Sequence, residues 1–144
     1  MIKLTETTPQ DVEQIREWTA ADPYHRDDPF CQYPELMVTG NGLLCFCIQD
    51  EEGPVCYVKL TEDGDLVEIA IQFGPETEVS RKRVSEALSV AGVPAMKIYA
   101  QEAGYRGLIF ESINPELIMF SKRFGFEAAG DDRVVAVFEE QTHV

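Results

Sequence analysis

The sequence predicts an α/β fold of the mixed α+β kind: a mostly antiparallel sheet with a central parallel strand pair, flanked by helices. Three short apolar segments, separated by acidic turns that contain glycine, are typical of an antiparallel meander. A long helical segment then leads to a fourth apolar strand, and such a crossover places two strands parallel. A strand–helix–strand unit follows at residues 107–126. We expect a single domain over residues 1–144.

The N-terminal segment is expected to form a strand and then a helix. Residues 2–5 predict a short strand. Thr8 and Pro9 predict a helix start, because threonine can cap free amide groups and proline at the first helical position loses no hydrogen bond. We expect this helix to end near Ala21. Its apolar face would carry Val12, Ile15, Trp18 and Thr19.

Residues 22–34 have no regular period. They contain three prolines, two tyrosines, a phenylalanine, a histidine and several acidic residues. The prolines predict a loop or a broken helix, and the aromatic content is too high for a disordered linker. Residues 35–38 are expected to finish a second short helix.

The middle of the chain predicts the meander. The expected strands are residues 43–49, 55–61 and 66–73. Both turns between them combine glycine with acidic residues, which is the chemistry of hairpin turns. Three consecutive antiparallel strands are therefore expected after the N-terminal helices.

Residues 79–103 predict the crossover. Their apolar residues recur at helical spacing, and Gly92-Val93-Pro94 interrupts the pattern. The pattern leaves open whether they form one kinked helix or two. The strands that begin at Leu66 and Gly107 are predicted to be parallel neighbours joined by this segment.

The unit at residues 107–126 has clear start and stop signals. Residues 107–113 form an apolar, β-branched run that is typical of a buried strand. Asn114 can cap a helix that begins at Pro115, and Gly125 can end it in the left-handed conformation before a strand opens at Phe126. The chain should then finish with a turn, a strand and a frayed end, at residues 130–133, 134–138 and 139–144.

This unit resembles the C-terminal motif of the GNAT superfamily, the acetyl-CoA-dependent N-acetyltransferases. Asn114 and Gly125-Phe126 stand at the family's separation, with Leu117, Ile118 and Phe124 on its apolar positions. The resemblance implies acyl transfer from acetyl-CoA, or another acyl-CoA, to an amine by direct attack in a ternary complex. Ser121 occupies the position of the family's tyrosine, the proposed general acid for the departing thiolate.

The resemblance also implies a phosphate site at the start of the crossover helix. The family binds pyrophosphate there with a Gln/Arg-x-x-Gly-x-Gly/Ala pattern, and this pattern is not intact in the sequence. We expect cofactor contacts from Arg81, Lys82, Arg83, Gly92 and Asn114. Anions favour helix starts, and the side chains of the three basic residues are expected on the surface. The alternative is that Glu76, Glu78 and Glu86 neutralise them on a solvated face.

Candidate catalytic residues follow from the same resemblance. Glu68 and Glu111 lie on the two strands that enter the cofactor site and are the carboxylates best placed to deprotonate an ammonium group. Ser121 could donate a hydrogen bond to a thiolate, although a hydroxyl is a poorer proton donor than a phenol.

The acceptor is expected to meet the connector after the first helix, where Tyr24, His25 and Asp27 are the candidate contacts. The alternative is an irregular connector whose aromatic side chains cover the core. A second alternative concerns the whole chain, which could be a GNAT-like binding or structural module without transfer chemistry.

Composition excludes several classes of partner. A formal net charge of −14 repels nucleic acid and anionic membranes but suits a cationic acceptor, whether a small-molecule amine or a protein amine. The sequence has neither an apolar run of membrane-spanning length nor the layout of a signal peptide, so a cytoplasmic location is expected. The oligomeric state stays open, with a homodimer as one option.

The four cysteines show no CxxC spacing, and no metal site is expected. Cys47 and Cys56 flank a predicted turn at positions that could face each other across a hairpin, so a disulfide is conceivable. We predict free thiols, because strand cysteines in a reduced compartment usually pack as small apolar side chains.

Overall fold

The computed structural model describes residues 1–138, apart from the side chains of Phe30 and Glu78. In this part of the chain, seven strands form one sheet in the order β1-β2-β3-β4-β5-β7-β6. The strands are β1 (Lys3–Glu6), β2 (Leu44–Asp50), β3 (Gly53–Asp63), β4 (Leu66–Phe73), β5 (Gly107–Glu111), β6 (Glu127–Ala128) and β7 (Arg133–Val137). β4 and β5 are parallel and the other described pairs are antiparallel, which confirms the predicted fold class and the predicted parallel pair. The expected fraying at residues 139–144 lies outside the described residues.

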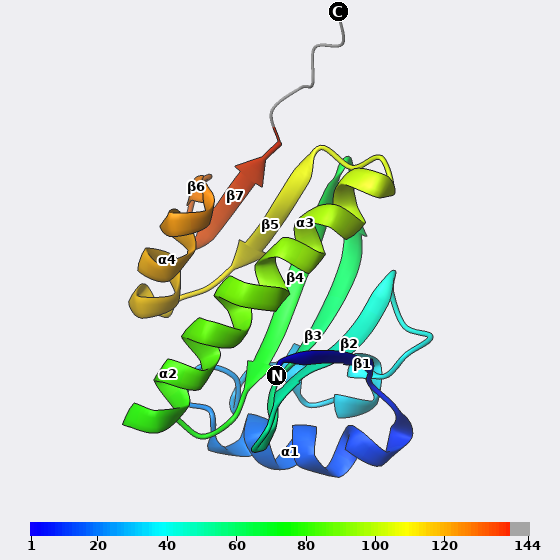
Figure 1. Ribbon diagram of the computed structural model, residues 1–144, viewed down its shortest axis with the longest axis vertical. Helices are drawn as coiled ribbons and strands as arrows, with labels where there is room; N and C mark the ends of the chain where they lie inside the picture. The colour runs from blue at the N-terminus through cyan, green and yellow to red at the C-terminus, as the bar shows by residue number, and fades with distance from the viewer. Residues whose placement is uncertain (139–144) are drawn as a thin grey trace, which may run out of the picture.

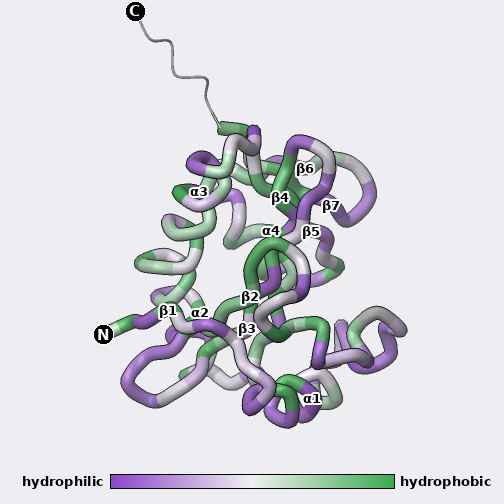
Figure 2. Tube along the Cα trace, turned by 90° about the vertical axis from the view of Figure 1, so that its right-hand side faces the viewer, coloured by the Kyte–Doolittle hydropathy of each residue, from purple (hydrophilic) through white to green (hydrophobic). Residues whose placement is uncertain are grey.

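Helices cover both faces of the sheet (Figure 1). The helical elements are η1 (Pro9–Asp11), α1 (Val12–Ala21), η2 (Pro29–Cys31), η3 (Pro34–Met37), α2 (Glu78–Ala87), η4 (Leu88–Gly92), α3 (Val93–Glu102), α4 (Pro115–Ser121) and η5 (Lys122–Phe124). Neighbouring residues of β2 point to opposite faces of the sheet. Ile48 packs in the same core cluster as Leu88 of the crossover, and Cys47 packs in a second cluster with Ile15 of α1. Apolar residues concentrate on the central strands in Figure 2, and hydrophilic residues mark the connecting turns. None of the described helices is long and apolar enough to cross a membrane.

The crossover is one continuous helical segment, which answers the question that the sequence left open. α2, the π-helical turn η4 and α3 follow one another, and the residues at both joints, Ala87 and Gly92, have right-handed helical backbone angles. The N–H group of Val93 donates to the carbonyl of Leu88, which is the wider spacing of a π turn. Pro94 lacks the N–H group that an α-helical bond requires, and the wider turn accommodates it without ending the helix.

The N-terminal helix has the apolar face that its spacing predicted. It begins with the 3-10 turn η1 and continues as α1, which ends at Ala21 as expected. Ile15 and Thr19 are buried. The ring of Trp18 lies 5.2 Å from that of Tyr57 on β3, centroid to centroid. α1 therefore packs against the face of the sheet opposite to the crossover.

The strand–helix unit after β5 forms as predicted. Asn114 Oδ1 accepts a hydrogen bond from the amide of Glu116 at 3.0 Å and so caps α4. Gly125 has a φ of 89°, in the left-handed region that favours glycine. β6 starts at Glu127, one residue later than expected, and the buried ring of Phe126 lies 5.2 Å from that of Phe110, centroid to centroid.

Arg83 ties α2 to the turn between β2 and β3. Its guanidinium group donates to both carboxylate oxygens of Asp50, at 2.7 and 2.6 Å, and to the carbonyl of Gly53 at 3.2 Å. The hydrogen bond from Arg83 lowers the pKa of Asp50. The expectation that the whole basic cluster lies free on the surface is wrong for Arg83, whose side chain folds back onto the hairpin and is only 25% exposed.

The cysteine thiols are free, as predicted. The register also corrects the idea that Cys47 and Cys56 could face each other, because Cys47 pairs with Tyr57 and Cys56 pairs with Ile48. Adjacent positions along a strand point to opposite faces, so the two thiols lie on opposite sides of the sheet.

Replacing Arg83 with alanine should destabilise the protein by about 1–2 kcal/mol, because hydrogen bonds to charged groups contribute on that order. Arg81→Ala is the matched control. The Arg81 side chain is 59% exposed and its ion pair with Glu76 lies on the surface, so its loss should cost less than ~0.5 kcal/mol. Urea unfolding measures both variants, and equal losses would contradict the structural role of Arg83.

The same ion pair should make stability depend on pH. Because the folded-state pKa of Asp50 is lowered, its stabilising contribution is present above the unfolded-state pKa of aspartate, about 3.9, and is lost as the pH falls through the folded-state value. The stability difference between wild type and Asp50→Asn should therefore shrink as the pH falls from about 7 to about 3. Urea unfolding across this range tests the sign, and a difference that grows toward acid would count against it.

All four cysteines should react with an alkylating reagent in denaturant without a reductant. In the native protein at neutral pH, labelling should be slow, because burial raises the pKa of Cys31 to about 11 and that of Cys47 to about 12, which leaves little thiolate. Mass spectrometry of the labelled protein gives the count. A denatured sample with fewer than four labels would disprove the prediction.

Candidate functional site

β4 and β5 pair for a short distance and then separate. The parallel register joins Leu66 with Gly107, Val67 with Leu108 and Glu68 with Ile109, and no further pair between these strands follows among the described residues. On its other side β4 stays paired with β3 as far as Phe73. Figure 1 shows the two strands starting together and diverging. Residues 69–73 of β4 therefore keep one free edge, with backbone groups that no neighbouring strand uses.

A cleft of about 610 Å³ opens at this separation. The connector after α1, the middle of β3 and β4, the end of β5, the crossover helix and α4 all contribute to its walls. Its apolar wall on the crossover side includes Ile69, Ile71, Leu88, Met96, Phe110 and Leu117. Polar side chains come from the connector, from the opposite face of the strands, and from the turn after β5 and α4, where Asn114 and Ser121 lie.

Two polar residues of β4, Glu68 and Gln72, line the cleft on either side of Ala70. They alternate with the core residues Val67 and Ile69, so they share the face that α1 partly covers. At roughly 3.3 Å per residue, Ala70 stands about 7 Å from each of its polar neighbours. The small alanine side chain leaves space between them.

A hydrogen-bonded network joins the connector to β4. His25 Nδ1 lies 2.8 Å from Gln72 Oε1 and 3.2 Å from Asp22 Oδ2. The Nε2 amide of Gln72 donates to Asp22 Oδ2 at 3.1 Å and to the carbonyl of Phe73 at 2.9 Å. Thr19 Oγ1 lies 3.1 Å from Gln72 Oε1. Gln72 is 4% exposed, so this network fixes the position of the connector on the sheet.

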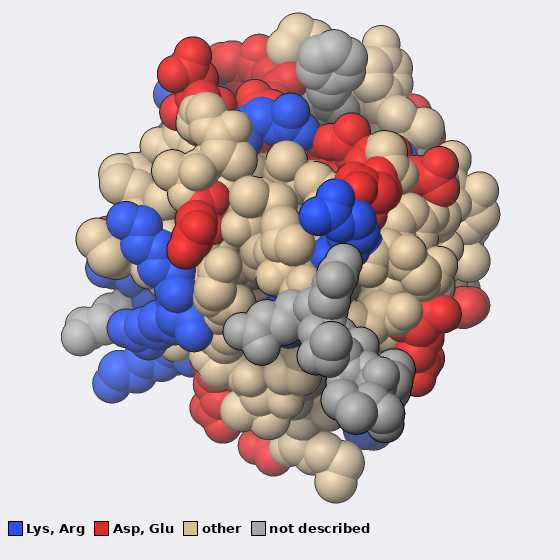
Figure 3. Space-filling view, turned by 90° about the horizontal axis from the view of Figure 1, so that it is seen from above, with Lys and Arg blue, Asp and Glu red and all other residues tan. Residues whose placement is uncertain are grey.

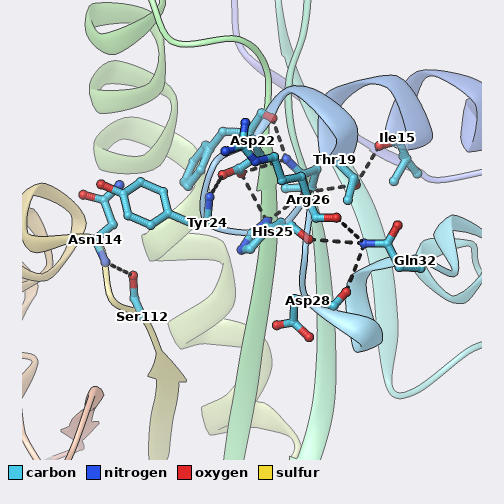
Figure 4. Close-up of polar contacts among 12 residues, drawn as sticks. Ile15, Thr19, Asp22, Tyr24, His25, Arg26, Asp28, Gln32, Ser112 and Asn114 are labelled. Carbon is cyan, nitrogen blue, oxygen red and sulfur yellow. Dashed lines mark hydrogen bonds and ion pairs between the residues drawn. The ribbon is translucent and has the colours of Figure 1, made fainter.

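The connector is also held by bonds within itself. The amide of Tyr24 donates to Asp22 Oδ1 at 2.8 Å, and Gln32 Nε2 donates to the carbonyls of Arg26 and Asp28 at 2.9 and 3.0 Å. Figure 4 shows these contacts, with Ser112 and Asn114 of the turn after β5 across from Tyr24. The predicted irregular loop is thus an ordered wall of the cleft.

The structure brings together six of the predicted site residues. The cleft is lined by Glu68, Glu111, Ser121, Asn114, Tyr24 and His25. Asp27 lies outside it with a side chain that is 91% exposed. Arg81, Lys82, Arg83 and Gly92 also lie outside its lining. In the described part of the chain, no group of three or more His, Cys, Asp or Glu side chains is arranged to hold a metal ion.

The start of α2 caps itself. Thr77 Oγ1 accepts from the amide of Ser80 at 3.0 Å, and the Ser80 hydroxyl accepts from the amide of Thr77 at 2.6 Å. Arg81 and Lys82 are exposed on this first turn. Gly92 lies inside the continuous helix, where an added Cβ would come within 2.8 Å of the Ile48 side chain. Its position therefore has a packing explanation.

Ser121 is buried, and its hydroxyl donates to the carbonyl of Ile118 at 2.7 Å. Asn114 likewise uses its side-chain oxygen to cap α4. Both residues line the cleft, but each already has a partner within its own helix. Contact with a ligand would require these groups to share or exchange their present hydrogen bonds.

Sequence reasoning missed several polar residues that line the cleft, among them Asp22, Gln72 and Lys59. Gln72 had a readable signal, because it lies an even number of positions from Glu68 on the same strand and so shares its face. Asp22 and Lys59 had none, since only the folded chain brings the connector and β3 to the cleft.

No model of a protein family matches this sequence, and no curated protein sequence matches it either. Solved structures do match. An aminoglycoside 6'-acetyltransferase of type Ii superposes with a TM-score of 0.70 at 11% identity, covering 97% of this chain and 99% of that one. The PaiA N-acetyltransferase from Thermoplasma acidophilum, in complex with coenzyme A, gives 0.64 at 14% identity, covering 96% and 99%.

A third match is the ribosomal-protein-S18-alanine N-acetyltransferase from Escherichia coli, with a TM-score of 0.64, 13% identity and 100% of each chain covered. At such low identity the likeness concerns the backbone. It extends over nearly the whole chain in all three comparisons, so it is not limited to the unit around α4. The chain has the fold of the GNAT family of acetyltransferases.

Proposed function

We propose that this protein transfers an acyl group from an acyl-CoA, expected to be acetyl-CoA, to an amine by direct attack in a ternary complex. The observation that carries the proposal is the separation of β4 and β5, which leaves the β4 edge free inside a cleft of about 610 Å³. The Thermoplasma acidophilum structure with the same fold holds coenzyme A, which supports this donor class.

The donor's pantetheine arm is proposed to lie along the free edge of β4. Its amide groups can pair with the backbone groups of residues 69–73, as an added strand would. The apolar wall formed by Ile71, Phe110 and Leu117 suits the thioester end of the arm.

The phosphates are proposed to meet the first turn of α2. Arg81 and Lys82 supply exposed positive charge there, and Arg83 adds its charge from within the ion pair with Asp50. Gly92 and Asn114 are proposed to shape the cofactor site without binding the phosphates. Gly92 lets the crossover helix pack closely against Ile48, and Asn114 fixes the start of α4.

The acceptor is proposed to enter from the connector side, past Tyr24 and His25, with Asp27 at the outer rim. Glu68 and Glu111 line the cleft and are proposed to hold its ammonium group by charge; both are also candidates to take its proton, directly or through water. Ser121 is proposed to donate to the departing thiolate. The compared enzymes are named for an aminoglycoside and for a ribosomal-protein alanine, which supports either a small-molecule amine or a protein amine.

Charge supports an amine acceptor rather than nucleic acid or a membrane. The net charge is −14. On the face seen in Figure 3, basic side chains gather in one group at the left edge, and acidic side chains occupy several other places. A cytoplasmic enzyme, with a homodimer as one possible assembly, is the proposed setting.

The second candidate is a GNAT-like binding or structural module. Two observations favour it: Ser121 replaces the tyrosine and already donates to Ile118, and the Thr77–Ser80 cap uses an amide that a phosphate would otherwise meet. Both candidates share the fold, so binding and turnover must separate them.

Coenzyme A and acetyl-CoA should stabilise the protein in a thermal-shift titration, by about 2.7 kcal/mol at 100 times the dissociation constant. The Arg81→Ala/Lys82→Ala variant should bind at least about tenfold more weakly, because it removes exposed phosphate partners, and wild-type binding should weaken as salt rises. Arg106→Ala is the matched control, since Arg106 is an exposed arginine paired with Asp65 at the other end of β4. Its affinity should not change.

The two candidates predict different outcomes of this titration. A wild type that is not stabilised by millimolar coenzyme A would rule out the transferase. Equal weakening in the double variant and in Arg106→Ala would place the phosphates elsewhere.

A further inference from the structure

The hydrogen-bonded network around His25 fixes its tautomer. The Gln72 amide is oriented by two acceptors, Asp22 Oδ2 and the carbonyl of Phe73, which both require its NH₂ group. Its oxygen therefore faces His25 Nδ1 at 2.8 Å, with Asp22 Oδ2 also near that nitrogen at 3.2 Å. Both neighbours accept, so the neutral imidazole carries its hydrogen on Nδ1 and its lone pair on Nε2.

The nitrogen with the lone pair belongs to a side chain on the cleft wall. His25 lines the cleft and is 30% exposed. Nδ1 is turned toward β4 and Asp22, so Nε2 is on the side of the ring away from them.

His25 and Glu68 flank the same space. His25 is bonded to Gln72, and Gln72 and Glu68 stand on either side of Ala70 at about 7 Å each. An amine bound over Ala70 would have the Glu68 carboxylate on one side and the imidazole on the other.

We propose that His25 is the general base of the transfer reaction, and that Asp22 and Gln72 position it; this inference rests on the proposed function. Nε2 takes a proton from the acceptor ammonium group, directly or through one water molecule. The nitrogen lone pair then attacks the thioester carbonyl, the C–S bond breaks and coenzyme A leaves as a thiolate. The new amide nitrogen gives up its second proton, which protonates the thiolate, and the imidazolium returns its proton to solvent.

Two properties favour the imidazole over the carboxylates for this role. Imidazole side chains as a class titrate near neutral pH, where a general base is most effective, whereas carboxylates as a class are weaker bases. Protonation at Nε2 also leaves the Nδ1–H bonds unchanged, and Asp22 lies beside Nδ1 to stabilise the positive charge. Glu68 and Glu111 then hold the ammonium group by charge.

The pH dependence follows from the groups around the cleft. The titratable and charged side chains that line it are Asp22, Tyr24, Asp28, Cys31, Tyr33, Lys59, Glu68 and Glu111. The proposal predicts that kcat/KM rises with pH along an acidic limb that depends on His25. A carboxylate base predicts a limb that depends on Glu68 or Glu111 instead.

The test compares His25→Asn with Glu68→Gln and Glu111→Gln, using acetyl-CoA and two acceptor probes, 1,4-diaminobutane and a peptide with an N-terminal alanine. Asparagine can keep an N–H donor near the Nδ1 position but cannot act as a base, so its melting temperature should stay near that of wild type. We expect kcat/KM at neutral pH to fall about 100-fold or more and the acidic limb to disappear. Added imidazole should partly restore turnover in His25→Ala.

Binding and structure give separate readouts. Coenzyme A affinity by thermal shift should be unchanged in His25→Asn, and ¹⁵N-detected NMR of the wild-type histidine ring should report the Nδ1–H tautomer at high pH. The role of His25 as the base would be overturned if the acidic limb of the kcat/KM profile persisted in His25→Asn, or if it disappeared only in a glutamate variant. Either result would leave the proposed transferase activity intact. A wild type that binds coenzyme A but acetylates neither probe would overturn both.

Discussion

The structure depends on how far β4 and β5 remain paired. The parallel ladder extends only through Leu66, Val67 and Glu68, and then the strands separate. A longer ladder would satisfy the backbone of β4 and close the sheet. The early separation leaves polar backbone groups exposed, which is costly unless water or a ligand meets them. The helices on either side are arranged around this opening, so the cleft is built into the topology.

The separation is maintained by the packing on both sides. On one face the crossover passes the sheet as a continuous helix, and the π turn before Pro94 keeps Leu88 and Met96 in the core. On the other face Gln72 joins the connector to β4 through a buried network. Because Gln72 is buried, each of its polar groups needs a partner, and the partners it finds fix the wall of the cleft.

The start of the crossover helix lacks the intact phosphate-binding pattern of the GNAT family, and the structure shows what its residues do instead. Thr77 and Ser80 cap α2, so the helix start is stable without a ligand. Arg83 binds the hairpin turn through Asp50. Within the basic cluster, Arg83 therefore stabilises the fold, whereas Arg81 and Lys82 present exposed positive charge. That division could not be read from three adjacent letters of sequence.

The sequence by itself determined the order of the elements and the parallel pair. Periodicity, the Asn114 cap and the Gly125 stop are local signals, and local signals act within a few residues of where they are read. The likeness of residues 107–126 to a known motif also pointed to Glu111 and Ser121, and the predicted parallel pair pointed to Glu68 on the partner strand. Only the tertiary structure decided that the crossover is one continuous helical segment, that Cys47 and Cys56 point to opposite faces of the sheet, and that His25 contacts Gln72. These depend on register and on contacts between residues far apart in the chain, which no local pattern encodes.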